Sequence, residues 1–120
     1  MSDFTLESFD AAVIKYVELH RFAAEEFDKA RHDARLLEGM GEAKLRDIIR
    51  NAPDLREIKN ADLKKLFAKG SKEYQDYICT ASEAQLEADR KYHALFSIQW
   101  RMEMLRSRFS FQKSIMSAGG

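Results

Sequence analysis

Mostly apolar side chains, large and small, recur with a seven-residue period along two long stretches of the chain, one beginning at Leu6 and the other ending at Met116. In each stretch, two interleaved rows of positions share one side of a helical wheel, as in a helix that packs along a partner helix. The sequence therefore predicts a long helix over about residues 5–38 and another over about residues 71–116. The repeating positions are Leu6, Phe9, Val13, Tyr16, His20, Ala23, Phe27, Ala30, Ala34 and Leu37 in the first stretch, and Tyr74, Tyr77, Ala81, Ala84, Ala88, Leu95, Ile98, Met102, Leu105, Phe109 and Met116 in the second.

The segment between the two long helices contains residues that end and restart helices. Gly39 and Gly41 adopt left-handed backbone geometry easily, so we expect the first helix to end there through such a turn. Pro53 interrupts the segment, because the residue before a proline disfavours helix. These signals predict short connector helices over about residues 43–69. The apolar face of the last connector helix is expected to consist of Leu63, Leu66 and Phe67.

Both long helices have small side chains at several repeating positions, such as Ala23 and Ala30 in the first and Ala81 and Ala88 in the second. Helices with small side chains along their contact faces can approach closely, so we expect the two helices to pair antiparallel. The predicted fold is all-α: a single domain over residues 1–120, built as a long, coiled-coil-like antiparallel hairpin with short connector helices.

A second apolar stripe lies on nearly the opposite side of the C-terminal helix from its repeating positions. One antiparallel partner can cover only one of the two stripes, and soluble monomers rarely expose a patch of large apolar side chains. We therefore expect the chain to form a homo-oligomer through this helix. The alternative is that the connector helices fold back over the second stripe. The predicted oligomer interface consists of Phe96, Trp100, Met104, Phe111 and Ile115.

Charge and composition narrow the range of functions that the chain can have. The chain has 20 basic and 20 acidic side chains, which argues against a generic polyanion-binding domain, since such domains carry a basic excess. The second half of the chain is the more basic one, so any anion-binding surface is expected there. The sequence has no membrane-spanning segment, and its first residues lack the basic start and apolar run of a signal peptide. We expect a cytoplasmic protein with no membrane partner.

Candidate catalytic and metal-binding residues are few. His20, His32 and His93 are scattered, and no Cys/His cluster has metal-site spacing. The lone cysteine, Cys79, is expected to be a small buried side chain. We therefore predict that the chain is not an enzyme, and that it has no catalytic residue, no metal and no cofactor. The two glycines near residue 40 also resemble the turn of a helix-hairpin-helix motif, but a helix-ending turn explains them equally well.

Four basic side chains, Arg101, Arg106, Arg108 and Lys113, lie between and beside the two stripes of the C-terminal helix, and only Glu103 opposes them. In an oligomer such side chains repeat once per subunit and create a basic surface that can bind a phosphate backbone. The alternative is that they are solvated edges of a coiled-coil contact.

Two stretches resemble the phage recombination mediator family typified by UvsY, whose members are small helical proteins that assemble into rings and load a recombinase on single-stranded DNA. The first is residues 34–41, which is similar to the glycine-terminated end of that family's first long helix. The second is residues 91–96 together with Trp100 and residues 105–115, which is similar to its C-terminal helix. The resemblance implies DNA contacts near the helix end from Lys29, Arg31, Arg35, Lys44 and Arg46, and from Arg101, Arg106, Arg108 and Lys113 in the oligomer.

The sequence hypothesis is therefore a cytoplasmic, phage-type accessory protein that self-assembles, binds single-stranded DNA and assists a recombinase as a recombination mediator. Several weak basic sites in one assembly would give avidity without any strong single site. The competing hypothesis is a protein-only helical adaptor or inhibitor, which docks a partner protein through the second apolar stripe.

Overall fold

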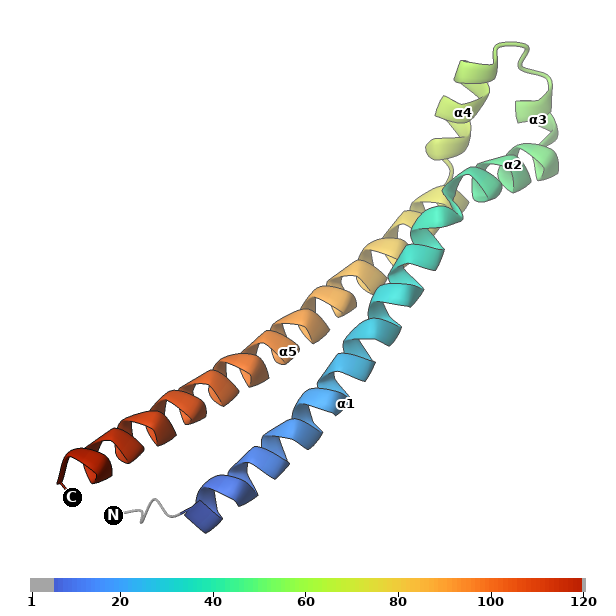
Figure 1. Cartoon of the computed structure of the whole chain (residues 1–120). Helices are drawn as coiled ribbons and strands as arrows, with labels where there is room; N and C mark the ends of the chain where they lie inside the picture. Colours follow the sequence, from blue (N-terminus) through green and yellow to red (C-terminus); the bar gives the residue numbers. More distant parts are fainter. Residues whose placement is uncertain (1–5, 120) are drawn as a thin grey trace. The chain divides into compact units, whose positions relative to one another are not determined.

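The computed structural model describes residues 6–119, and every regular element in that range is a helix (Figure 1). The helices are α1 (Leu6–Gly39), α2 (Gly41–Asn51), α3 (Pro53–Arg56), α4 (Ala61–Lys69) and α5 (Lys72–Gly119). The predicted all-α class is confirmed, and the two long helices end within a few residues of their predicted bounds. The expected helix start at residue 5 lies outside the described residues.

Local sequence accounts for these helix ends. Pro53 stands at the first position of α3, where its missing N–H costs nothing. The Asn60 side chain accepts a hydrogen bond of 3.1 Å from the Leu63 amide and so caps α4. Between Lys72 and Ala118 no proline or glycine interrupts α5, which explains its 48-residue length.

The junction between α1 and α2 differs from the expected turn. Among the described residues no glycine has a positive φ. Met40 is the single residue between the two helices, and it has ordinary right-handed geometry with φ −88° and ψ −1°. The expectation of a left-handed turn at Gly39 and Gly41 is therefore wrong, and the short junction leaves no room for a helix-hairpin-helix loop.

The chain divides into two compact units, Met1–Asp28 with Arg90–Gly120 (unit 1) and Lys29–Asp89 (unit 2). The prediction of one domain over residues 1–120 stays a prediction. Unit 1 combines the first part of α1 with the later part of α5. Unit 2 combines the end of α1, the connector helices and the start of α5.

In unit 1, side chains of α1 between Phe9 and Glu26 contact side chains of α5 between Lys91 and Phe109. Phe9 stacks on Phe109, and the His20 ring lies 3.2 Å from the Gln99 amide. The Lys91 ammonium lies 3.5 Å from the Glu26 carboxylate. As residue numbers rise along α1, the numbers of their partners on α5 fall. The repeating positions of α1 in this unit whose side chains are described are all buried or half-buried, namely Phe9, Val13, Tyr16, His20, Ala23 and Phe27.

Unit 2 has a small apolar core between the connector helices. Leu45 and Ile48 of α2 are buried together with Ala68 of α4, and half-buried side chains, among them Tyr74 of α5, pack around them. The predicted apolar face of α4 is not the face that packs in this core, since Ala68 is buried while Leu63, Leu66 and Phe67 are exposed.

Candidate functional site

The main candidate surface is the second apolar stripe of α5 in unit 1, hereafter the α5 stripe. Its side chains are between 51% and 64% exposed. A large exposed apolar patch of this kind is typical of an interaction site. The alternative in which the connector helices cover the stripe stays a prediction, because those helices belong to unit 2. The α5 stripe consists of Phe96, Trp100, Met104, Phe111 and Ile115.

The heptad pattern explains why the stripe is left uncovered. The repeating positions Leu95, Ile98, Met102, Leu105 and Phe109 are half-buried, so they form the face of α5 that packs within unit 1. On a wheel of about 100° per residue, the α5 stripe lies nearly opposite that face. One exception concerns the end of the helix: Met116 was predicted in the packed row but is 74% exposed.

A groove on one side of Trp100 combines aromatic and basic side chains. Trp100 and Phe111 of α5 line it together with Tyr16 of α1. Arg101 and Arg108 line the same groove. Aromatic faces and guanidinium groups together can stack on nucleic-acid bases and neutralise phosphates. The remaining lining residues are Met104, Leu105 and Ser107.

A second groove lies on the other side of Trp100, and an acidic side chain is present in it. There Arg106 pairs with Glu103 at 3.2 Å, and both side chains are well exposed. An exposed ion pair of this kind stabilises by at most about 1 kcal/mol, so its role is to reduce the positive charge on this side of the helix. His20, Phe96, Gln99 and Met102 complete this second groove.

The nine basic residues predicted to bind nucleic acid do not all fall in one unit. Arg101, Arg106, Arg108 and Lys113 belong to unit 1 and are exposed. The five residues near the α1–α2 junction belong to unit 2, and all are exposed except the half-buried Lys44. The unit 2 residues are Lys29, Arg31, Arg35, Lys44 and Arg46.

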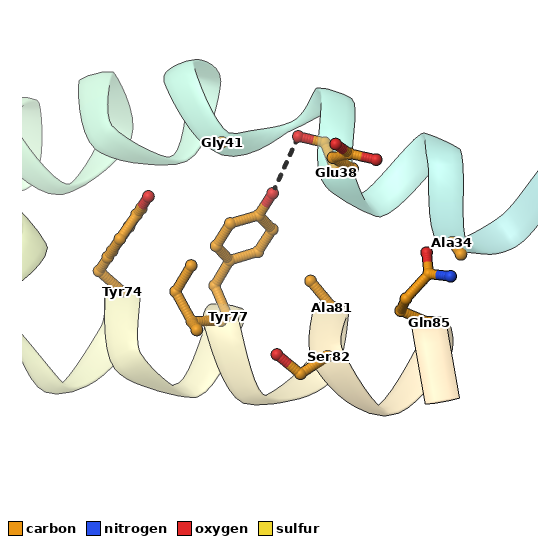
Figure 2. A pocket seen from close by; sticks show the side chains of 9 residues that line it. Ala34, Glu38, Gly41, Tyr74, Tyr77, Ala81, Ser82 and Gln85 are labelled. Atoms are coloured by element: carbon orange, nitrogen blue, oxygen red, sulfur yellow. Dashed lines mark hydrogen bonds between the residues drawn. The ribbon is translucent and has the colours of Figure 1, made fainter. Parts of the chain in front are cut away.

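Unit 2 has its own pocket, which Figure 2 shows beside the α1–α2 junction. The Tyr77 hydroxyl donates a hydrogen bond to the Leu37 carbonyl oxygen and lies 3.4 Å from the Glu38 carbonyl oxygen. Burial raises the pKa of Tyr77, and the nearby Tyr74 and Glu38 raise it further. The hydroxyl therefore keeps its proton and donates it in a hydrogen bond to a backbone oxygen. This arrangement suits Tyr77 to holding α5 against the end of α1 rather than to proton transfer.

Sequence reasoning missed an exposed face on α1, hereafter the α1 face. Ile14 and Phe22 are 65% and 62% exposed, although both lie in a helix whose opposite side is packed. Neither residue belongs to the heptad rows, which contain the packed positions of the helix. Exposed acidic side chains accompany them on the same part of the wheel, namely Glu7, Glu18 and Glu25, with Asp10 at the edge.

Within the described residues no three His, Cys, Asp or Glu side chains gather in a way that could hold a metal ion. Cys79 is exposed, which contradicts the expectation of a buried thiol. None of the described helices combines the length and the apolar character needed to cross a membrane.

Comparison with known proteins finds no match for this chain. No protein-family model matches the chain, no curated protein matches its sequence, and no solved structure matches its fold.

Proposed function

We propose that this chain is a non-enzymatic accessory protein that assembles with copies of itself, binds single-stranded DNA and assists a recombinase as a mediator. In this proposal α1 and α5 form one antiparallel coiled-coil hairpin, and the α5 stripe is the self-association surface. A cytoplasmic location and the resemblance to phage recombination mediators belong to the same proposal.

The observation that carries the DNA-binding proposal is the groove beside Trp100. Exposed aromatic side chains, Trp100 and Phe111, line it together with the guanidinium groups of Arg101 and Arg108. Single-stranded nucleic acid is held by this combination, because every base has a face that stacks and every nucleotide has a phosphate. Trp100 and Phe111 also belong to the α5 stripe, so DNA and a neighbouring copy compete for this groove, and the strand binds copies whose α5 stripe is not covered by a neighbour.

Fluorescence anisotropy with a labelled oligothymidylate, measured over a series of salt concentrations, tests the proposal. We expect binding that weakens as salt rises. The double variant Arg101→Ala with Arg108→Ala loses two phosphate contacts, so its log–log salt slope should be shallower by about 1.4. The matched control is Lys59→Ala with Lys72→Ala, which removes two exposed charges from unit 2. Parent-like binding by the first variant would show that the groove is not the site.

Stacking is tested separately with Trp100→Ala. Loss of one stacked base should weaken binding by about 1–3 kcal/mol, which is roughly 5- to 150-fold. Because Trp100 also belongs to the α5 stripe, the mass of this variant is measured by light scattering under the same conditions. A variant that keeps the parent's mass but binds DNA less tightly supports a stacking role.

The exposed apolar surface favours a second candidate, a protein-only adaptor that docks a partner protein through the α5 stripe. Leu63, Leu66 and Phe67 of α4 give unit 2 an exposed apolar face as well. An adaptor of this kind requires no nucleic acid. A parent protein that fails to bind the oligothymidylate even at low salt would therefore exclude the DNA-binding proposal and leave the adaptor.

A further inference from the structure

The two helical segments of unit 1 differ strongly in charge. Residues 7–28 carry six acidic and two basic side chains, a net charge of −4. Residues 90–118 carry six basic and one acidic side chain, a net charge of +5. Opposite charges on two surfaces favour their contact, whereas like charges disfavour it.

Both segments also leave apolar side chains exposed outside their mutual contact. The α1 face contains Ile14 and Phe22 among acidic side chains, and the α5 stripe is flanked by Arg101 and Arg108. The basic side chains on or beside the α1 face are Lys15, which is exposed next to Phe22 on the wheel, and Arg21, whose guanidinium lies 2.5 Å from the Glu18 carboxylate on the same helix. The face stays acidic overall because Glu7, Asp10 and Glu25 surround this pair.

The two faces also match in length. The α1 face runs from Glu7 to Glu25, about 27 Å at 1.5 Å per residue. The α5 stripe runs from Phe96 to Ile115, about 28 Å on the same scale. One helix can therefore lie along the other over their full exposed lengths.

We propose that the α5 stripe of one copy is covered by the α1 face of a second copy, so that the self-association surface joins two different faces of the chain. This inference rests on the self-association part of the proposed function and gives it a specific geometry. A contact between two α5 stripes would instead bring Arg101 and Arg108 against the same residues of the second copy, and this like-charge contact opposes it.

A contact between two different faces has a consequence for assembly. Each copy that uses its α5 stripe still offers its α1 face, so further copies can add until the assembly closes on itself or continues as a filament. A contact between two identical faces would stop at two copies.

In the proposed contact, acidic side chains of the neighbour would also lie beside Arg101 and Arg108. They would compete with phosphates for these two guanidinium groups.

A charge-swap experiment tests this geometry. The α1-swap variant carries Asp10→Lys, Glu18→Lys and Glu25→Lys, and the α5-swap variant carries Arg101→Glu and Arg108→Glu. In each variant alone, the two faces have charges of the same sign. In a mixture, the basic α1 face of the first variant meets the acidic α5 stripe of the second, and the two unchanged faces are also complementary.

The readout is light-scattering mass without DNA, at low salt, with helix content checked by circular dichroism. We expect the parent to have at least about twice the mass of one chain, which is 13.9 kDa. Each variant alone should fall towards one chain, and an equal mixture should return to the parent's mass. The matched control, Asp33→Lys with Asp76→Lys and Glu83→Lys in unit 2, should keep the parent's mass.

Three outcomes would overturn the inference. If the α1-swap variant assembles like the parent, the α1 face takes no part in the contact. If each variant is a single chain but the mixture does not assemble, the two faces do not meet. If the parent is a single chain, there is no self-association to explain. None of these outcomes depends on DNA, so the DNA-binding proposal stands or falls on its own measurement.

Discussion

The phenyl ring of Phe9 stacks on that of Phe109, with the ring centroids 4.0 Å apart and the ring planes inclined by 18°. Both rings occupy repeating positions of the heptad pattern, and both are half-buried. This aromatic contact joins the first turn of α1 to the later part of α5 in unit 1. Stacked rings of this kind contribute about 0.5–1.5 kcal/mol beyond the area they bury.

Removing this ring should destabilise unit 1. We expect Phe109→Ala to lower the free energy of unfolding by about 1–3 kcal/mol, less than the roughly 3–5 kcal/mol of a fully buried phenylalanine. Urea unfolding is measured at a protein concentration where light scattering gives a single chain, because assembly would add its own stability. The control is Phe67→Ala, which removes a ring that is 55% exposed. Equal losses for the two variants would contradict a packed role for Phe109.

The hydroxyl of Tyr77 should make a measurable contribution in unit 2. Tyr77→Phe removes its hydrogen bond to the Leu37 carbonyl, and we expect a loss of about 0.5–1.5 kcal/mol at neutral pH. The control is Tyr92→Phe, a change to a half-exposed tyrosine in unit 1. A loss of stability in the control alone would show that the hydrogen bond between Tyr77 and Leu37 does not stabilise the fold.

Tyr77 also predicts that the free energy of unfolding depends on pH. In the folded chain the pKa of Tyr77 is raised above the ordinary 10.0, so the folded state retains the proton more strongly than the unfolded state. Its stabilising contribution is therefore complete below pH 10 and is lost as the pH rises through the folded pKa. Above pH 10, the difference in unfolding free energy between the parent and Tyr77→Phe should shrink. A difference that grows in that range would show that the pKa is lowered.

The glycines at the α1–α2 junction should be replaceable. A Cβ at Gly39 would meet nothing within 4 Å, and one at Gly41 would touch the Tyr77 hydroxyl oxygen at an ordinary 3.5 Å. Since neither backbone has a positive φ, Gly39→Ala and Gly41→Ala should each be neutral or stabilise by up to about 1 kcal/mol. Thermal unfolding followed by circular dichroism measures this. A clear loss of stability would point to left-handed geometry at the junction.

Local signals in the sequence were enough to predict the helices and most of the packed face. Pro53 and Asn60 act within one turn of their own position, so they can be recognised without knowing the fold. The heptad rows are predictive because a seven-residue period fixes one side of a long helix. Met116 continues the heptad row but is exposed. Phe109, one heptad earlier, already pairs with Phe9 near the described start of α1.

Features that depend on the partner of a short helix could not be predicted. The nine-residue α4 buries Ala68 and exposes Leu66 and Phe67, because its rotation is set by contact with α2 and not by its own pattern. The groove beside Trp100 was missed for a similar reason. Tyr16 reaches it from the other long helix, and nothing in the spacing of the two segments indicates that meeting.

The contacts between the early and late parts of the chain also imply an order of folding. Tyr77 and Leu37 are 40 residues apart in sequence, whereas His20 and Gln99 are 79 apart. The entropy lost on closing a loop grows with the logarithm of its length, so the longer loop costs about 0.6 kcal/mol more. The contacts nearest the connector can therefore form first, and each shortens the loop that the next must close. In refolding kinetics, substitutions near Tyr77 should slow folding, whereas Phe109→Ala should mainly speed unfolding.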